Sequence, residues 1–177
     1  AGTEDQVDVD VRVKERQTGT MSFGLGYSES DGVLLQAAIN QKNLFGSGKE
    51  LDISIDTSKI SKSARIRYFN PYYTVNGVSR GFYLTWTDID AAEADLSRYI
   101  NATLSLGVNY RIPLSEHNSF SFSFGPDRSK LSTTDGTPDE IRAYIAVHPD
   151  DWYLKTTASW NHDSRDSILY PTEGFNF

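Results

Sequence analysis

The strongest constraint on this fold is a two-residue alternation of apolar and polar side chains, which recurs along the whole chain. In its clearest segment one face carries Ile100, Ala102, Leu104, Leu106, Val108 and Tyr110. The other face carries Asn101, Thr103, Ser105, Gly107, Asn109 and Arg111. Because successive side chains of a β-strand point to opposite faces, this pattern predicts a strand with one apolar and one polar surface.

Eight segments of this kind follow the first 17 residues of the chain. They cover residues 21–27, 33–40, 51–56, 64–68, 82–87, 100–111, 120–124 and 152–161, and 175–177 resembles the start of a ninth. Compact turns rich in Asn, Pro and Gly alternate with polar, acidic loops, as expected for up-and-down strands. In the long loop from Asp127 to Asp151, Pro138 and the acids after it predict the start of a short helix through Val147, and Pro149 ends it. An earlier alternation from Val7 to Val13 predicts a separate strand with a charged outer side.

Composition excludes several classes of protein. Hydrophobic residues make up only 38% of the 177 residues, and no window of about 18 apolar residues could form a membrane helix. The formal charge of -7 argues against binding to nucleic acid phosphates. The absence of cysteine excludes disulfides, thiolate metal sites and a cysteine nucleophile. No signal peptide opens the sequence, and its first three residues are typical of a processed start.

Two all-β folds fit the alternation, a soluble β-sandwich and a transmembrane β-barrel. Segments of up to about ten residues suit a tilted membrane strand better than the roughly five or six residues of soluble strands. The polar face lacks aliphatic residues almost throughout, as a water-filled interior would require. Aromatic residues also gather near segment ends, for example Tyr27, Tyr68, Tyr110 and Trp160, as in interfacial girdles. These features favour a transmembrane up-and-down antiparallel β-barrel with one short helix in its long outer loop, and a sandwich remains the alternative.

Several stretches resemble the BamA family of outer-membrane β-barrel assembly factors. Residues 5–16 resemble the last strand of that family's final POTRA domain, and residues 18–27 resemble its first barrel strand. Residues 43–48 and Asn70-Pro71-Tyr72-Tyr73-Thr74 are similar to its first two periplasmic turns. Asp163-Ser164-Arg165-Asp166 with Tyr170-Pro171-Thr172-Glu173-Gly174 resembles a further turn. The family has a larger barrel and additional POTRA domains, so this resemblance implies a fragment. Residues 1–17 would end a periplasmic POTRA domain, and 18–177 would form the N-terminal half of a transmembrane barrel of about eight strands.

The resemblance implies that the protein folds and inserts β-barrel proteins into the outer membrane of a Gram-negative bacterium. Its N-terminal end would lie in the periplasm. Its partners would be nascent outer-membrane β-barrel proteins, accessory assembly lipoproteins and outer-membrane lipids, without nucleic acid and without a cofactor. The first barrel strand would be a lateral gate that pairs with incoming client strands by β-augmentation. The client-binding residues would be Thr20, Met21, Ser22, Phe23, Gly24, Leu25, Gly26 and Tyr27.

The first strand also has a purely structural interpretation. Gly24 and Gly26 lie on its polar side, where glycine could relieve crowding inside the barrel or allow the wall to curve. The turn residues Asn70, Pro71, Tyr72, Asp163, Arg165, Asp166, Pro171 and Gly174 are expected to be structural. Arg65, Arg67 and Arg111 are expected to face the interior, where Asp52 and Asp56 could balance their charge, or a segment outside this chain could pair with them.

No enzymatic motif stands out. His117, His148 and His162 lack the spacing of metal ligands, and the carboxylate pairs of the loops lack the spacing of an EF-hand. No Gly-x-Ser-x-Gly elbow is present, and Gly24-Leu25-Gly26 lacks the third glycine of a nucleotide-binding loop. We therefore expect neither catalysis nor a metal site. Alternative functions are polypeptide translocation by a relative of the same family, a passive porin-like barrel, and binding by a soluble sandwich.

Overall fold

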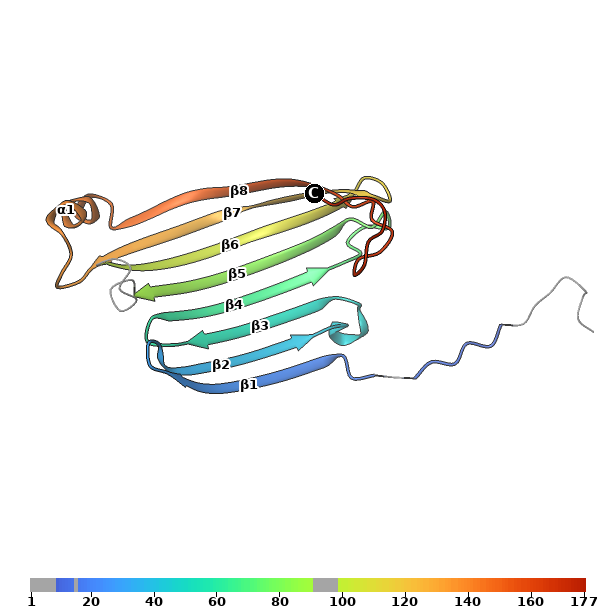
Figure 1. The fold of residues 1–177 in the computed structure, drawn as a ribbon, viewed down its shortest axis with the longest axis horizontal. Coiled ribbons are helices and arrows are strands. Elements are labelled where there is room, and N and C mark those ends of the chain that lie inside the picture. The colour runs from blue at the N-terminus through green and yellow to red at the C-terminus, as the bar shows by residue number, and fades with distance from the viewer. Residues whose placement is uncertain (1–8, 15, 91–98) are drawn as a thin grey trace, which may run out of the picture.

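The computed structural model describes residues 9–14, 16–90 and 99–177, which form one curved antiparallel sheet (Figure 1). Its eight strands follow each other in chain order, and each pairs with the next. The strands are β1 (Gly19–Ser28), β2 (Gly32–Gln41), β3 (Glu50–Thr57), β4 (Ser61–Asn70), β5 (Ser79–Asp90), β6 (Tyr99–Pro113), β7 (Asn118–Thr133) and β8 (Asp150–His162). The helices are the short 3-10 helix η1 (Leu44–Gly46) and α1 (Asp139–Val147).

The strand register gathers the apolar side chains on one face. A continuous row of paired positions crosses the first six strands at Met21, Ile39, Ile53, Ile66, Leu84 and Leu106. One residue away, a polar row runs through Ser54, Arg65, Thr85, Ser105 and Asp127. A shift of one residue in any pair would exchange the faces, so the alternation of each strand is consistent with this register throughout.

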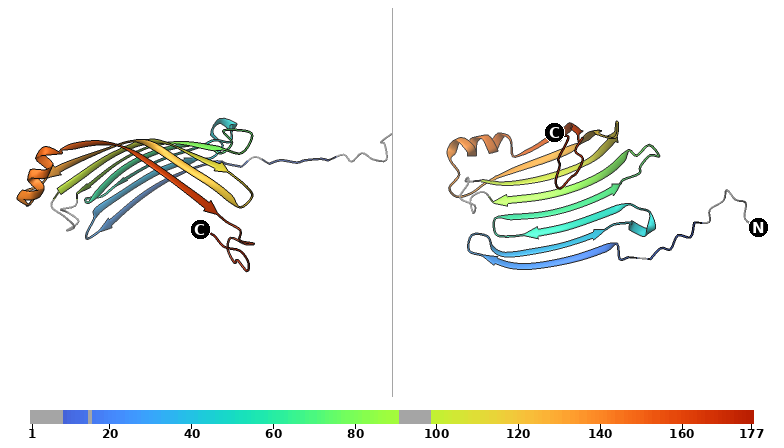
Figure 2. Two further views of the ribbon diagram at one scale, coloured as in Figure 1. Left: turned by 90° about the horizontal axis from the view of Figure 1, so that it is seen from above. Right: turned by 45° about the vertical axis from the view of Figure 1, so that its right-hand side comes forward.

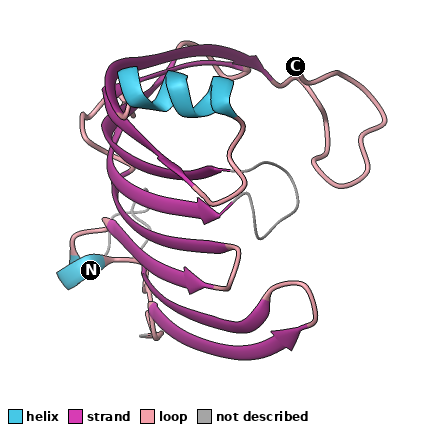
Figure 3. Cartoon of the chain, turned by 90° about the vertical axis from the view of Figure 1, so that its left-hand side faces the viewer, coloured by secondary structure: helices cyan, strands magenta, loops and turns pink. Residues whose placement is uncertain are grey.

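No second layer packs on the apolar face of the described sheet. Met21 is 77% exposed, Leu106 50% and Leu154 71%, and the single hydrophobic residue buried among the described residues is Ile145 of α1. A soluble sandwich would bury these side chains between two sheets. The sheet instead curls into a trough (Figures 2 and 3), and polar-face residues from β4 to β8 line a common cavity of about 570 Å³ on it. This is the wall of a transmembrane barrel, with its apolar side outward.

The connections agree with the up-and-down topology expected from the sequence. The turns after β2, β4 and β6 lie at one end of the sheet, and α1 lies at the other (Figure 1). Pro138 precedes the first residue of α1, and Asp139 and Glu140 occupy its first turn, as the sequence predicts. The acidic loop between β5 and β6 falls largely on residues 91–98, which lie outside the described residues.

The strand expected over Val7 to Val13 is not formed at the residues that the structure describes. Residues 9–14 have no strand assignment, and the side chains of Val9, Val11 and Val13 are exposed. Residues 7 and 8 lie outside the described part. A strand requires a neighbour to receive its hydrogen bonds, and the alternation alone cannot supply one. The assignment of residues 1–17 to a POTRA domain remains a prediction.

The backbones of β6 and β7 lie very close to each other at Gly125. The pairing of these strands stops at Ser105 opposite Asp127 and resumes at Val108 opposite Phe124. Pro126 lies in this gap and has no N–H to donate. A methyl group at Gly125 would overlap the carbonyl oxygen of Leu106, so only glycine fits here without a backbone shift.

The turn after β8 is held by two aspartates. Asp163 accepts hydrogen bonds from Nε and Nη2 of Arg165, both at 2.9 Å, and these bonds hold its pKa well below the ordinary value. The hydroxyl of Thr172 donates to Asp166 at 2.5 Å, and the backbone N–H groups of Thr172 and Glu173 donate at 2.9 and 3.1 Å. These bonds, that of the Thr172 hydroxyl first, lower the pKa of Asp166 to about 2.

Substitution Gly125→Ala is expected to lower the stability of the folded barrel by about 1–3 kcal/mol, because the β6 backbone must move to admit the methyl group. Gly24→Ala is the matched control, because its added carbon would lie 3.6 Å from Cβ of Gln36, an ordinary contact. Denaturant titration of each variant, folded in lipid vesicles, measures its unfolding midpoint. Equal midpoints for the two variants would contradict the close approach.

Substitution Thr172→Val is expected to raise the pKa of Asp166 from about 2 toward the ordinary value near 3.8, because its largest stabilising bond is lost. Because the pKa of Asp166 is lower in the folded protein than in the unfolded protein, its carboxylate stabilises the turn at pH values above the unfolded pKa. This stabilisation is lost as the pH falls through the folded pKa. The contribution of Asp166 to the stability of the turn should therefore decline as the pH falls below about 4 and be lost near pH 2. NMR titration of the Asp166 carboxyl carbon tests this, and an unchanged pKa in the variant would refute it.

Candidate strand-pairing edge

Strand β1 forms one edge of the described sheet. All ten of its residues pair with β2, from Gly19 opposite Gln41 to Ser28 opposite Gly32, and no described strand pairs with its other side. The eight residues expected from the sequence to bind client strands, Thr20 to Tyr27, therefore all lie on this edge. In Figure 1 the edge runs along the bottom of the sheet.

The hydrogen bonds of β1 alternate between β2 and the free side. The backbone N–H of Lys42 donates to the carbonyl of Thr18 at 2.8 Å, so these two residues form a hydrogen-bonded antiparallel pair. Such pairs recur at every second residue. Even-numbered residues of β1 therefore bond to β2, and the N–H and C=O groups of odd-numbered residues point to the free side. These are Gly19, Met21, Phe23, Leu25 and Tyr27.

The apolar side chains of β1 are also more exposed than those of the interior strands on the outer face. Phe23 is 76% exposed and Leu25 71%, whereas Ile66 in β4 is 44% exposed and Leu84 in β5 38%. The interior strands have a neighbour on both sides, and β1 has a neighbour on one. A strand added at this edge would cover both the odd-numbered backbone groups and these side chains.

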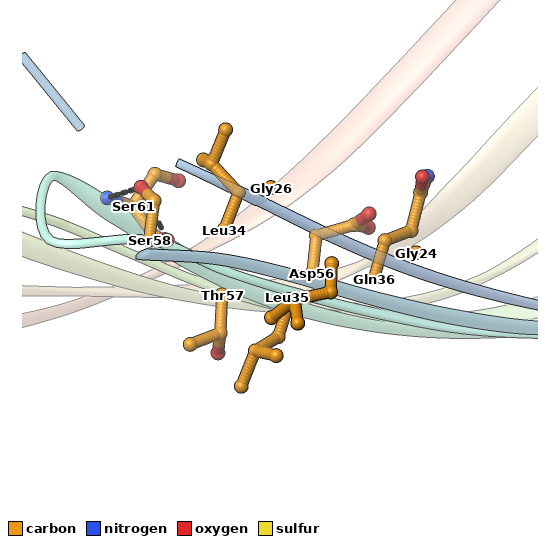
Figure 4. Close-up of a pocket in the computed structure, with 10 residues that line it drawn as sticks. Gly24, Gly26, Leu34, Leu35, Gln36, Asp56, Thr57, Ser58 and Ser61 are labelled. Atoms are coloured by element: carbon orange, nitrogen blue, oxygen red, sulfur yellow. Dashed lines mark hydrogen bonds between the residues drawn. The ribbon is translucent and has the colours of Figure 1, made fainter. Parts of the chain in front are cut away.

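Gly24 and Gly26 place no side chain on the inner face of β1. Carbons added at Gly24 and Gly26 would lie 3.6 Å from Gln36 and Leu34, which is ordinary contact, and neither glycine has a positive φ. Neither crowding nor backbone conformation in this structure therefore requires glycine at these positions. A recess of about 440 Å³ opens beside them, and Figure 4 shows Leu34, Gln36 and Asp56 on one side of the sheet and Leu35 and Thr57 on the other.

Strand β8 forms the opposite edge, and the end of the chain covers part of it. His162 and Phe177 exchange backbone hydrogen bonds of 3.0 and 3.1 Å, and Asp163 pairs with Asn176. The rings of Trp160 and Phe177 meet edge to face with centroids 4.9 Å apart. The segment 175–177 thus lies against β8 as the beginning of a ninth strand would. By contrast, β1 is open along its whole length among the described residues.

The inner face carries a mixed set of charges. Arg67 forms an ion pair with Asp52 at 2.6 Å, as the sequence predicts, and Arg111 donates to the hydroxyl of Ser119 at 3.2 Å. Arg65 lies on the same face and is exposed. Sequence reasoning missed the pairing of Lys155 with the buried Asp127, at 3.9 Å, because it placed Asp127 at the start of the long loop. In the structure β7 continues to Thr133, so Asp127 lies in this strand on the polar face.

The expected turn residues lie away from the β1 edge. Asn70 accepts a hydrogen bond from the backbone N–H of Tyr72 at 3.2 Å, with Pro71 between them, in the turn after β4. Asp163, Arg165 and Asp166 bind within the turn after β8. Pro171 lies in the same turn, and Gly174 adopts a φ of 84°, which favours glycine. These bonds are internal to each turn.

The described residues contain no group of three or more His, Asp or Glu side chains that could hold a metal ion. His117 and His162 lie 6.3 Å apart by ring centroid, and His148 stacks on Tyr144 in the distant outer loop. No helix in the described part of the chain has the length and apolar character needed to cross a membrane.

Comparison with known proteins identifies relatives along nearly the whole chain. BamA of Neisseria meningitidis serogroup B, an outer membrane protein assembly factor, is 29% identical over 99% of this chain and 23% of its own length. BamA of Buchnera aphidicola is 28% identical over 72% of this chain and 21% of its own length. A crystal structure of BamA from Haemophilus ducreyi, lacking POTRA domains 1–3, superimposes with a TM-score of 0.65 at 25% identity, over 92% of this chain and 33% of that one.

This chain thus spans about a quarter of the length of its curated relatives and corresponds to part of their barrel. The resemblance to the BamA family noted in the sequence is confirmed by these matches. The model of the Omp85 superfamily domain matches residues 43–177, about three quarters of the chain. The chain belongs to the Omp85 superfamily.

Proposed function

We propose that the protein containing this chain folds β-barrel proteins and inserts them into the outer membrane, and that β1 templates the incoming strands. The observation that carries this proposal is the open edge of β1, where the N–H and C=O groups of five odd-numbered residues point away from β2 and meet no other described strand. The similarity to BamA of Neisseria meningitidis and of Buchnera aphidicola, both named outer membrane protein assembly factor, supports the same function.

The physical basis of templating is the cost of an open sheet edge in lipid. Each unpaired backbone group costs several kcal/mol in hydrocarbon, where water cannot bind it. A nascent strand with the same unmet requirement would pair with β1 and satisfy both edges at once. The energy of assembly then comes from the client's own hydrogen bonds and burial, and no nucleotide or covalent step is needed.

The proposed orientation follows the family. Residues 1–17 end a periplasmic POTRA domain, residues 18–177 form the N-terminal half of the barrel, and the turns after β2, β4 and β6 face the periplasm. Clients are nascent outer-membrane β-barrel proteins. Accessory lipoproteins and outer-membrane lipids complete the set of partners.

Disulfide crosslinking in the full-length protein tests the templating step. Leu25→Cys is expected to crosslink to cysteines in a client strand during assembly, because Leu25 lies on the open edge with its side chain 71% exposed. Ile66→Cys is the matched control, because Ile66 lies on the same face but in β4, which pairs on both sides. Absence of any adduct at Leu25, or equal adducts at both positions, would contradict the proposal.

A proline in the Leu25→Cys background separates pairing from simple proximity. Phe23→Pro removes an N–H that points to the free side, so pairing with β2 should survive while the client crosslink falls at least several-fold. Ser22→Pro removes an N–H that bonds to β2 and should destabilise the barrel itself.

Ion conductance without any client adduct would instead favour a passive barrel, and transport of polypeptides across the membrane would favour a translocating relative.

A further inference from the structure

Arg80 lies on the membrane-facing side of the sheet. It is the second residue of β5, and its backbone partners are Asn70 in β4 and Tyr110 in β6. Phe82, two residues further along β5, lies on the same face and is 43% exposed. A guanidinium on the outer wall of a barrel is unusual, since a charge there must avoid the hydrocarbon or find a counter-ion.

Two aromatic rings hold the guanidinium of Arg80. Its central carbon lies 3.7 Å from the centroid of the Tyr73 ring and 5.1 Å from that of Phe82. Tyr73 in turn contacts Tyr110 edge to face, with centroids 6.3 Å apart. These contacts orient the planar group by cation–π attraction but supply no hydrogen-bond acceptor.

Among the described residues Arg80 lacks the acidic partner that three arginines of the sheet and its turns have. Arg67 pairs with Asp52, Arg128 with Asp150 and Arg165 with Asp163. Within the described part of the chain no carboxylate forms an ion pair with Arg80, and its buried Nε has no hydrogen-bond partner. Because Nε is enclosed while the residue as a whole is partly exposed, the terminal nitrogens are the groups left for an external acceptor.

The position of Arg80 along the strand matches an interface between lipid and water. Arg80 is the second residue of β5 and follows the turn over residues 71–78, so it lies at the end of the strand, where the apolar band of a barrel wall, about 25 Å tall, meets water. Tyr73 contacts the guanidinium of Arg80, Tyr110 lies opposite Arg80 in β6, and Tyr68 contacts Phe82. Tyrosine is enriched at the level of lipid head groups. An anion at this depth is a lipid phosphate, which accepts two parallel hydrogen bonds from a guanidinium.

We propose that Arg80, held between Tyr73 and Phe82, binds the phosphate of a membrane phospholipid head group. The site rests on the outward orientation of the apolar face. Under the proposed function the turn after β4 faces the periplasm, so Arg80, which follows this turn, would bind a lipid of the periplasmic leaflet. It does not involve β1. Lipid binding and client crosslinking can therefore fail independently of each other.

Photolabelling of the full-length protein tests the site. Phosphatidylglycerol with a photoreactive acyl chain is titrated onto the protein in neutral detergent, and labelling is quantified on the peptide that covers residues 70–86. Arg80→Gln is expected to raise the half-saturating concentration about tenfold, as loss of a charged hydrogen bond implies. Arg65→Gln is the matched control, because it removes the same charge from an exposed position on the opposite face of β4. It should label as the unmodified protein does.

Three further arms separate the possible outcomes. Photoreactive diacylglycerol, which has no phosphate, should label the unmodified protein and Arg80→Gln equally. Arg80→Lys keeps the charge without the planar fork, so an intermediate value is expected, and this variant also serves if Arg80→Gln fails to fold. Inorganic phosphate at the same concentration should not displace the lipid. Equal labelling of Arg80→Gln and Arg65→Gln, full retention in Arg80→Lys, or displacement by inorganic phosphate would overturn the proposal.

Discussion

Main-chain hydrogen bonding between neighbouring strands is the constraint on which this structure depends. In hydrocarbon no water can replace a missing partner, so every strand within a membrane must pair on both sides or meet a pairing segment from elsewhere. Strands β2 to β7 satisfy this rule within the chain. Among the described residues no strand pairs with the outer side of β1. The outer side of β8 is paired near His162, where Phe177 bonds to it. Under the proposed function, the edges of the described sheet, and not a cavity with reactive groups, are therefore where the protein would act on another polypeptide.

The same register that pairs the backbone also separates the two environments. It lines up Ile53, Ile66 and Leu84 on the outer face, one residue away from Ser54, Arg65 and Thr85 on the inner face. Charges on the inner face are balanced across strands, as by Arg67 and Asp52. Charged residues on the outer face have to lie near the ends of the strands, close to water, and Arg80 among tyrosines is one of them. Two exceptions to the pattern of the wall underlie the proposals made above: the edge of β1, with which no described strand pairs on its outer side, and the charged side chain of Arg80 on the apolar face.

Much of the fold could be predicted from the sequence, because its main signals are local. The two-residue period predicts the strands and their faces, and Pro138 with its following acids predicts the start of α1. The motif of residues 18–27 also indicates the edge strand, through family resemblance. Contacts between distant residues could not be read in this way. The approach of Gly125 to Leu106, the pair of Lys155 with Asp127 and the rings around Arg80 all depend on register. Local alternation also misleads at residues 9–14, where the pattern of a strand is present but no neighbour pairs with it.

Spin-label accessibility in lipid bilayers tests the orientation of the two faces most directly. A label placed in turn at each position from Phe82 to Thr87 of the full-length protein reports contact with oxygen, which concentrates in lipid, and with a nickel complex, which stays in water. Even-numbered positions should respond to oxygen and odd-numbered positions to nickel, with a period of two residues. If the even-numbered positions responded to neither reagent, their side chains would be packed against a second protein layer, and the membrane wall with its open edge would be contradicted.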